Sequence, residues 1–121
     1  KCSIKDLLMN QRIVAGLGNI YVNETLYFCK IYPEKIGYKI RDKDIRKLVS
    51  VIKKILKNAI IAGGSTIKNY HNSEGKTGSF QKNFKVYGRE DKECLRTSCN
   101  GKIRRIIRSG RSIFYCSKCQ T

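Results

Sequence analysis

The chain of 121 residues is long enough for one domain or two small ones with a modest hydrophobic core. Hydrophobic residues make up 40% and charged residues 29%, a balance typical of soluble globular proteins, and no signal peptide or membrane-spanning run is recognisable. The net charge is +17. A phosphate backbone would attract such a charge, whereas a neutral partner or a small metabolite would not require it.

Two short helices are expected near the N-terminus. Ser3 and Asp6 resemble a capping box that starts the first helix. In the stretch VAGLGN, Gly16 and Gly18 interrupt the pattern, and Asn19 follows as the expected N-cap of the second helix. A glycine-rich turn before a helix lets backbone N–H groups approach a phosphate, although a tight turn without any ligand would use the same residues.

A longer amphipathic helix is predicted by the segment DKDIRKLVSVIKKILKNAIIAGG. Asp42 is its expected N-cap, and Gly63-Gly64 is its expected C-terminal stop. The face of this helix opposite its apolar stripe is basic. We expect it to be the solvated side of a core helix, with a membrane or partner contact as the alternative. The predicted apolar stripe comprises Ile45, Leu48, Val49, Ile52, Ile55, Leu56, Ala59 and Ile60.

The second cluster of positive charge lies at the C-terminus, where residues 94–121 carry seven basic residues and no acidic one. The segments KIRRIIR and RSIFY predict two strands, and Ser109-Gly110 between them predicts a two-residue turn. Such a hairpin is too small for a core of its own, so we expect a metal ion to be needed for its folding.

Four of the six cysteines form two close pairs, Cys94-x4-Cys99 and Cys116-x2-Cys119, separated by sixteen residues. This spacing favours a tetrahedral zinc site with four thiolate ligands. Two disulfides in a secreted protein are the alternative. The remaining cysteines, Cys2 and Cys29, have no matching partner, and we expect them to be reduced packing residues.

Several motifs, taken together, resemble the C-terminal half of bacterial formamidopyrimidine-DNA glycosylase, which shares its fold with endonuclease VIII. The motifs are IKDLLMNQRIVAGLGNIYVNETLY, AIIAGGSTIKNY, GSFQKNFKVYGR and GRSIFYCSKCQ. The resemblance covers nearly the whole chain. It implies a mainly α fold, with a helix–two-turns–helix motif in a helical domain (residues 1–88) followed by a zinc-bound β-hairpin (residues 89–121). The family usually has two residues in the first cysteine knuckle, where this chain has four.

The resemblance also implies roles for particular residues. Lys5, Asn19 and Arg111 match the residues with which the family clasps the phosphates beside an extruded nucleotide. Gly16 and Gly18 lie in the DNA-binding turn, and we expect Arg104, Arg105 and Arg108 to steer the hairpin toward DNA. One structural Zn²⁺ would be bound by Cys94, Cys99, Cys116 and Cys119.

The segment HNSEGKTGSF matches the family's loop that folds over the extruded base, although an ordinary polar loop is the alternative. The residues implied in this lesion loop are Gly75, Lys76, Thr77, Gly78, Ser79 and Phe80.

Members of the family excise oxidised purines and then cleave the strand at the abasic site. Their catalysis uses an N-terminal proline followed by a glutamate, whereas this chain opens with Lys1-Cys2-Ser3. We therefore expect a bacterial cytoplasmic monomer that binds damaged double-stranded DNA without a catalytic residue of its own. A Schiff base between Lys5 and an abasic sugar is the alternative route to residual lyase activity.

Two further classes of protein fit the charge and the cysteines. A helix-turn-helix regulator would bind undamaged DNA sequence-selectively, yet the helix after Asn19 carries few groups that read base edges. An RNA-binding zinc ribbon would bind folded RNA and ignore abasic duplex. A zinc module that binds only protein would not require the charge.

Overall fold

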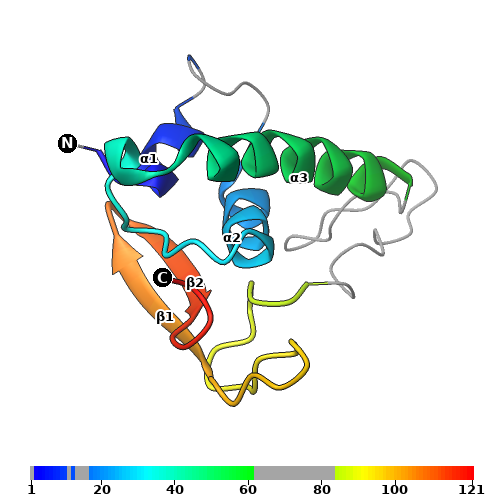
Figure 1. The fold of residues 1–121 in the computed structure, drawn as a ribbon. Helices are drawn as coiled ribbons and strands as arrows, with labels where there is room; N and C mark the ends of the chain where they lie inside the picture. The colour runs from blue at the N-terminus through cyan, green and yellow to red at the C-terminus, as the bar shows by residue number, and fades with distance from the viewer. Residues whose placement is uncertain (1, 11, 13–16, 62–83) are drawn as a thin grey trace.

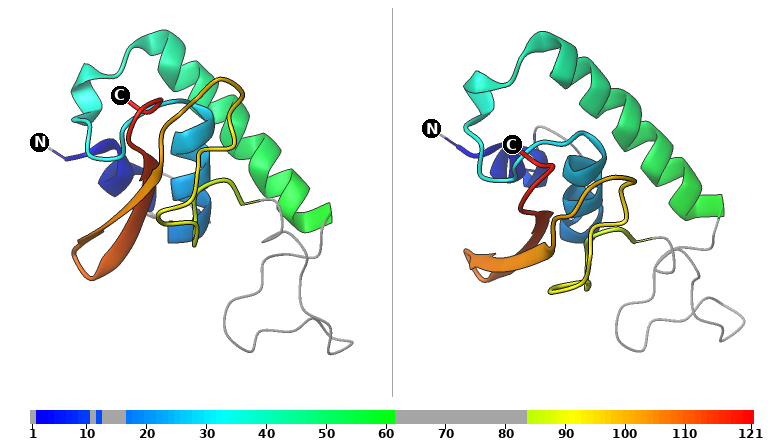
Figure 2. Two further views of the ribbon diagram at one scale, coloured as in Figure 1. Left: turned by 90° about the horizontal axis from the view of Figure 1, so that it is seen from below. Right: turned by 60° about the horizontal axis from the view of Figure 1, so that its bottom comes forward.

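The computed structural model describes residues 2–10, 12, 17–61 and 84–121. Helix α2 lies between α3 and the β-hairpin, as the views in Figures 1 and 2 show. The expected order, helices followed by a two-stranded antiparallel hairpin, is confirmed. The elements are α1 (Ile4–Met9), α2 (Asn19–Phe28), the short 3-10 helix η1 (Gly37–Lys39), α3 (Asp42–Ile61), β1 (Ile103–Arg108) and β2 (Arg111–Cys116).

Helix α1 begins at the predicted cap. The backbone N–H of Asp6 donates a hydrogen bond to Ser3 Oγ at 3.1 Å, which satisfies one of the free donors of the first turn. Ile4 and Leu8 are buried in a core shared with α2 and α3. The cap and the apolar spacing are sufficient to predict this short helix from the sequence.

Helix α2 corrects one prediction, because its N-cap is Gly18 and not Asn19. Gly18 has extended backbone angles (φ −92°, ψ 175°), and Asn19 is the first helical residue. Instead of capping its own helix, the Asn19 side chain donates from Nδ2 to the carbonyl oxygen of Ser112 in β2 at 3.1 Å. The start of α2 is therefore tied to the hairpin.

The middle of α2, residues 22–27, is buried on all sides. Three of these residues are polar. The side-chain oxygens of Asn23 and Glu24 have backbone partners, whereas Thr25 Oγ1 has no hydrogen-bond partner among the described residues. Asn23 Oδ1 accepts the N–H of Phe114 at 3.0 Å, and the Glu24 carboxylate accepts three N–H groups from residues 85–87 at 2.7, 2.9 and 2.9 Å. Because buried polar groups need such partners, α2 holds both the hairpin and the chain that leads to it.

Helix α3 is confirmed, but its buried stripe is narrower than predicted. Leu48 and Ile55 are buried, and Ile52 and Leu56 are partly buried against the core, as is Val51, which lay outside the predicted stripe. The predicted stripe members Ile45, Val49 and Ile60 are 44%, 49% and 79% exposed. Among the described elements, α3 packs mainly against α2 (Figure 1), and Ile55 also packs against Phe84, whereas the flanks of the predicted stripe remain exposed.

The predicted N-cap of α3 is also wrong. The helix already includes Asp42, and the carbonyl of Arg41 accepts the first helical hydrogen bond, from the N–H of Ile45 at 3.0 Å. Asp42 therefore lies in the first turn, where its negative charge still interacts favourably with the positive end of the helix dipole. The expected stop at Gly63-Gly64 lies outside the described residues. None of the described helices combines the length and the apolar character that a membrane crossing requires.

The hairpin has the predicted turn. Arg108 pairs with Arg111 in the antiparallel register, which leaves Ser109 and Gly110 as the two loop residues. Both have positive φ, 53° and 75°, as the two central residues of a type I′ turn require. This turn sets the register, and the register places Arg111 at the tip.

Replacing Glu24 with glutamine should destabilise the fold. The amide has one acceptor oxygen where the carboxylate has two, so at least one buried N–H of residues 85–87 would lose its acceptor. Such a loss costs about 1–3 kcal/mol. The measurement is the free energy of unfolding in urea for Glu24→Gln and for the matched control Glu90→Gln, whose glutamate is exposed. Equal stability of the two variants would contradict this role.

Candidate metal centre and nucleic-acid interface

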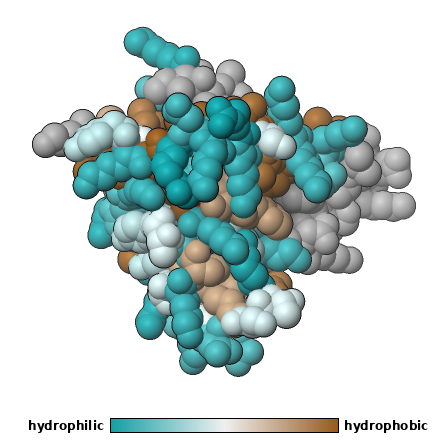
Figure 3. Space-filling view, in the orientation of Figure 1, coloured by the Kyte–Doolittle hydropathy of each residue, from teal (hydrophilic) through white to brown (hydrophobic). Residues whose placement is uncertain are grey.

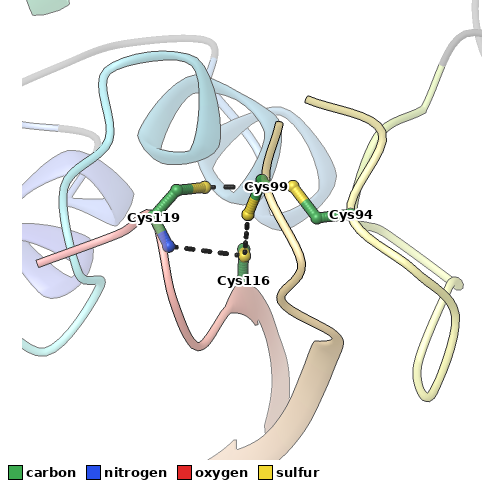
Figure 4. Close-up of side chains that lie close together, drawn as sticks. All are labelled: Cys94, Cys99, Cys116 and Cys119. Carbon is green, nitrogen blue, oxygen red and sulfur yellow. Dashed lines mark hydrogen bonds between the residues drawn. The ribbon is translucent and has the colours of Figure 1, made fainter. Parts of the chain in front are cut away.

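The four cysteines that the sequence predicts as ligands converge near the base of the hairpin (Figure 4). Their Sγ atoms all lie within 4.8 Å of one another. Cys94 and Cys119 are 3.9 Å apart, and Cys99 and Cys116 are 3.6 Å apart. A disulfide needs an S–S distance of about 2.05 Å, and all four thiols are free. The alternative of two disulfides is therefore wrong.

The separations fit a tetrahedral metal ion. Four sulfurs held about 2.3 Å from a common centre would lie about 3.8 Å from one another. The Cys94–Cys119 and Cys99–Cys116 distances of 3.9 and 3.6 Å lie on either side of that value. Four thiols also form a donor set that prefers soft or borderline metals over Mg²⁺ or Ca²⁺. The cage can thus hold one metal ion.

The long first knuckle closes through a turn. The N–H of Cys99 donates to the carbonyl of Arg96 at 3.0 Å, and Ser98 has a positive φ of 67°. At Gly101, a Cβ would lie 2.7 Å from the Sγ of Cys116, so only glycine fits beside the cage. The four residues between Cys94 and Cys99 therefore allow the sulfurs of this first pair to lie beside those of Cys116 and Cys119.

Cys94 is the thiol best prepared for ionisation. Burial alone would raise the pKa of Cys94, but hydrogen bonds from the Tyr27 hydroxyl, the Arg96 backbone N–H and two neighbouring thiols lower it to about 7. Burial raises the pKa of Tyr27, so the tyrosine keeps its proton and can donate to Cys94 Sγ across their 3.3 Å contact when that thiol is ionised. The thiolate is the form that binds metal.

A second site lies where α1, the start of α2 and the hairpin tip meet. The pKa of Lys5 on α1 is lowered, mainly by burial and also by the charge of Arg111, while Asp6 opposes the shift. Arg111 is exposed and directly precedes Ser112, to which Asn19 is hydrogen-bonded. Three residues predicted to contact phosphate are thus brought to one part of the structure from separate segments.

The other hairpin arginines differ from one another. Arg108 Nε donates to Glu34 Oε2 at 2.9 Å, and Arg105 Nε donates to Ser112 Oγ at 3.0 Å. Arg104 is exposed on β1. Hydrophilic residues cover much of the face seen in Figure 3. Because Glu34 compensates Arg108, the predicted steering charge lies more with Arg104 and Arg105.

Sequence reasoning missed the residues that position these sites. Asn23 and Glu34 hold the hairpin through Phe114 and Arg108, and no spacing or motif marks them. Arg96 had a signal, because it lies inside the unusually long knuckle. Of the two remaining cysteines, Cys29 is buried as predicted, whereas Cys2 is exposed and its predicted packing role is wrong.

Some predicted residues lie outside the described ranges. They are Gly16 of the DNA-binding turn and the lesion-loop residues Gly75, Lys76, Thr77, Gly78, Ser79 and Phe80.

Comparison with known proteins identifies the class of this molecule. Residues 1–71 match the family model described as the formamidopyrimidine-DNA glycosylase H2TH domain. Formamidopyrimidine-DNA glycosylase of Rickettsia africae is 47% identical over 120 residues, which cover 99% of this chain and 43% of the relative. The same enzyme of Roseobacter denitrificans is 47% identical over 117 residues, 97% of this chain and 41% of the relative.

Solved structures agree with the sequence comparison. A Lactococcus lactis FPG mutant in complex with a Fapy-dG containing DNA superposes with a TM-score of 0.88 at 40% identity, covering 99% of this chain and 43% of that one. The Lactococcus lactis Fpg bound to an abasic site containing DNA gives the same TM-score, identity and coverage. The fold and cysteine cage therefore define an H2TH-type module with a potential zinc finger.

The chain belongs to the formamidopyrimidine-DNA glycosylase family, and its resemblance to the C-terminal half of that enzyme is confirmed. It spans 43% of the length of the curated Rickettsia africae relative.

If the cage holds a metal ion, removing that ion should disorder the core around the cage. That core contains Tyr27, Val86, Ile103 and Phe114 as well as the cysteines, and four uncompensated thiols cannot hold it together. The measurement is amide hydrogen exchange of the hairpin before and after treatment with a strong chelator. We expect loss of protection in the hairpin and recovery when zinc is added back.

Paired cysteine variants serve as the control for this metal removal. Cys119→Ser should lower the metal content of the purified protein, whereas Cys2→Ser, at an exposed cysteine outside the cage, should leave it unchanged. A metal-free protein whose hairpin stays protected would contradict the requirement for metal.

Proposed function

We propose that this chain is the DNA-gripping part of a DNA glycosylase and abasic-site lyase that excises oxidised purines such as formamidopyrimidine and 8-oxoguanine. The observation that carries the proposal is the placement of Lys5 and Arg111 beside the start of α2. Family relatives solved with Fapy-dG containing and abasic DNA support the choice of a damaged duplex as ligand.

Lys5 and Arg111 are neighbouring cations, and their repulsion raises the free energy of this site when no phosphate is bound. Burial is the main factor that disfavours the charged form of Lys5 and lowers its pKa; Asp6 opposes this shift, and the Arg111 charge adds to it. A phosphate between them would relieve this repulsion. Only 3% of Lys5 is exposed, so it would act from a covered position, whereas the exposed fork of Arg111 suits bidentate phosphate contact.

The start of α2 favours an anion for a different reason. Its free backbone N–H groups and its dipole attract negative charge. Among the described residues, nothing lies within 4 Å of the position that a Cβ on Gly18 would occupy, so these residues leave the backbone open to a phosphate there. We therefore propose that α1, the intervening turn and α2 act as a helix–two-turns–helix motif.

We further propose that the cage holds one structural Zn²⁺, since four thiolates at tetrahedral separations are the ligand set that zinc prefers. Its role would be to fix the hairpin that carries Arg111. The proposed organisation is a helical domain at residues 1–88 and a zinc finger at residues 89–121. We propose that the described residues grip DNA without a catalytic group, as a monomer in the bacterial cytoplasm.

Replacing Arg111 with alanine should weaken binding to a duplex that carries a stable abasic-site analogue. If the wild type neutralises about four phosphates, log Kd should change with log salt with a slope of about 3.6 in magnitude, and each lost contact should lower it by about 0.9. The measurement is fluorescence anisotropy at several salt concentrations. Lys5→Met, which keeps the apolar stem, should likewise weaken binding and lower the magnitude of the salt slope.

The matched control is Arg46→Ala, which removes the same charge from an exposed position on α3. It should change the affinity less than Arg111→Ala does. Equal losses for the two variants would show that only the general charge matters and would contradict the phosphate site. Excision of 8-oxoguanine or cleavage of an abasic strand by this chain alone would contradict the proposal that it lacks a catalytic group.

A further inference from the structure

Arg96 lies in the middle of the long first knuckle and makes three contacts beyond it. Its Nη1 lies 3.1 Å from Cys119 Sγ, and its Nη2 donates to the carbonyl of Tyr27 at 2.9 Å. The guanidinium carbon is 4.3 Å from the centre of the Tyr27 ring. One side chain thus joins the first knuckle to the second knuckle and to the last turn of α2.

Tyr27 completes this arrangement from the helix. Tyr27 is 3% exposed, and its hydroxyl lies 3.3 Å from Cys94 Sγ. A metal-bound thiolate carries no proton, so the tyrosine must be the donor in the loaded site. Arg96 and Tyr27 therefore offer one N–H and one O–H to two different ligand sulfurs.

The charge of the loaded cage explains why such donors matter. Four thiolates around a divalent ion leave a net charge of about −2 in a partly buried place. A guanidinium against one sulfur and a hydroxyl against another lower the cost of that charge, and outer partners of this kind orient the ligands as well.

The turn formed by the longer knuckle makes this contact sterically accessible. The Cys99 N–H bonds back to the carbonyl of Arg96, and the positive φ of Ser98 reverses the chain directly after Arg96. The chain therefore returns to the cage at Cys99 while the arginine reaches across to Cys119 and α2. The longer knuckle thus provides both the turn that returns the chain to the cage and the arginine that contacts Cys119 and α2.

We propose that Arg96 and Tyr27 form an outer shell that retains the metal ion and locks the cage to α2. The inference rests on the proposed occupancy of the cage by zinc. It adds that metal retention depends on a cation from the knuckle and a hydroxyl from the helix, and that loss of either weakens the link between the hairpin base and α2.

The test compares zinc-loaded wild type with Arg96→Met, Arg96→Lys and Tyr27→Phe. Competition with a chromophoric chelator measures zinc affinity, and we expect Arg96→Met to lose about 10–100-fold, as outer-shell changes do. The zinc affinity of Arg96→Lys should lie between those of the wild type and Arg96→Met, because lysine keeps the charge but lacks the fork that reaches both partners. Tyr27→Phe should weaken affinity while keeping the ring.

The matched control is Arg104→Met, at an exposed arginine on β1, which should keep wild-type zinc affinity. Cobalt substitution gives a second readout, because lost hydrogen bonds to sulfur should shift the thiolate-to-cobalt charge-transfer band in the Arg96 and Tyr27 variants and not in the control. If Arg96→Met fails to fold, the zinc affinities and cobalt spectra of Arg96→Lys and Tyr27→Phe test the outer shell.

The outcomes separate the two proposals. A wild-type protein that binds no zinc contradicts the proposed metal. A wild type that holds zinc, together with Arg96→Lys and Tyr27→Phe variants of unchanged affinity and unchanged cobalt spectrum, overturns the outer shell alone.

Discussion

The arrangement of both sites depends on the buried amide of Asn23. Its Oδ1 accepts the Phe114 N–H at 3.0 Å, and its Nδ2 donates to the Asn19 carbonyl at 2.9 Å. Asn23 therefore fixes β2 against the first turns of α2. A buried amide without these partners would cost about 1–3 kcal/mol, so hairpin and helix cannot separate cheaply. The position of Arg111 relative to the helix start follows from this contact.

The cage fixes the other end of the same hairpin. Cys116 ends β2 and Cys119 follows it, while Gln120 accepts the Cys116 N–H at 2.7 Å and donates to the Ile31 carbonyl at 2.9 Å. The hairpin is thus held near its tip by Asn19 and Glu34, in the middle of β2 by Asn23, and at its base by the cage and Gln120. A two-stranded hairpin is marginal in water on its own, and anchoring at both ends lets it present an arginine in a defined place.

Much of this fold could be predicted from local patterns. The Ser3 cap, the presence of α3, the Ser109-Gly110 turn and the cysteine cage all rest on short-range spacing, which can be recognised in the sequence. Three of the errors have a common cause. Asn19, Ile45 and Val49 were misassigned because a tertiary partner, or its absence, overrode the local preference. The contacts of Asn23 and Arg96 reach across distant segments, so periodicity does not reveal them, although the unusual length of the first knuckle draws attention to Arg96.

The central claim is that phosphate binds where Lys5, the start of α2 and Arg111 meet. The most direct measurement is an NMR titration of the labelled chain with a duplex that carries an abasic-site analogue. We expect the largest shifts at the backbone amides of Gly18 and Asn19 and at the Arg111 side-chain Nε. Largest shifts on the basic face of α3, with residues around Gly18 and Arg111 unmoved, would contradict it.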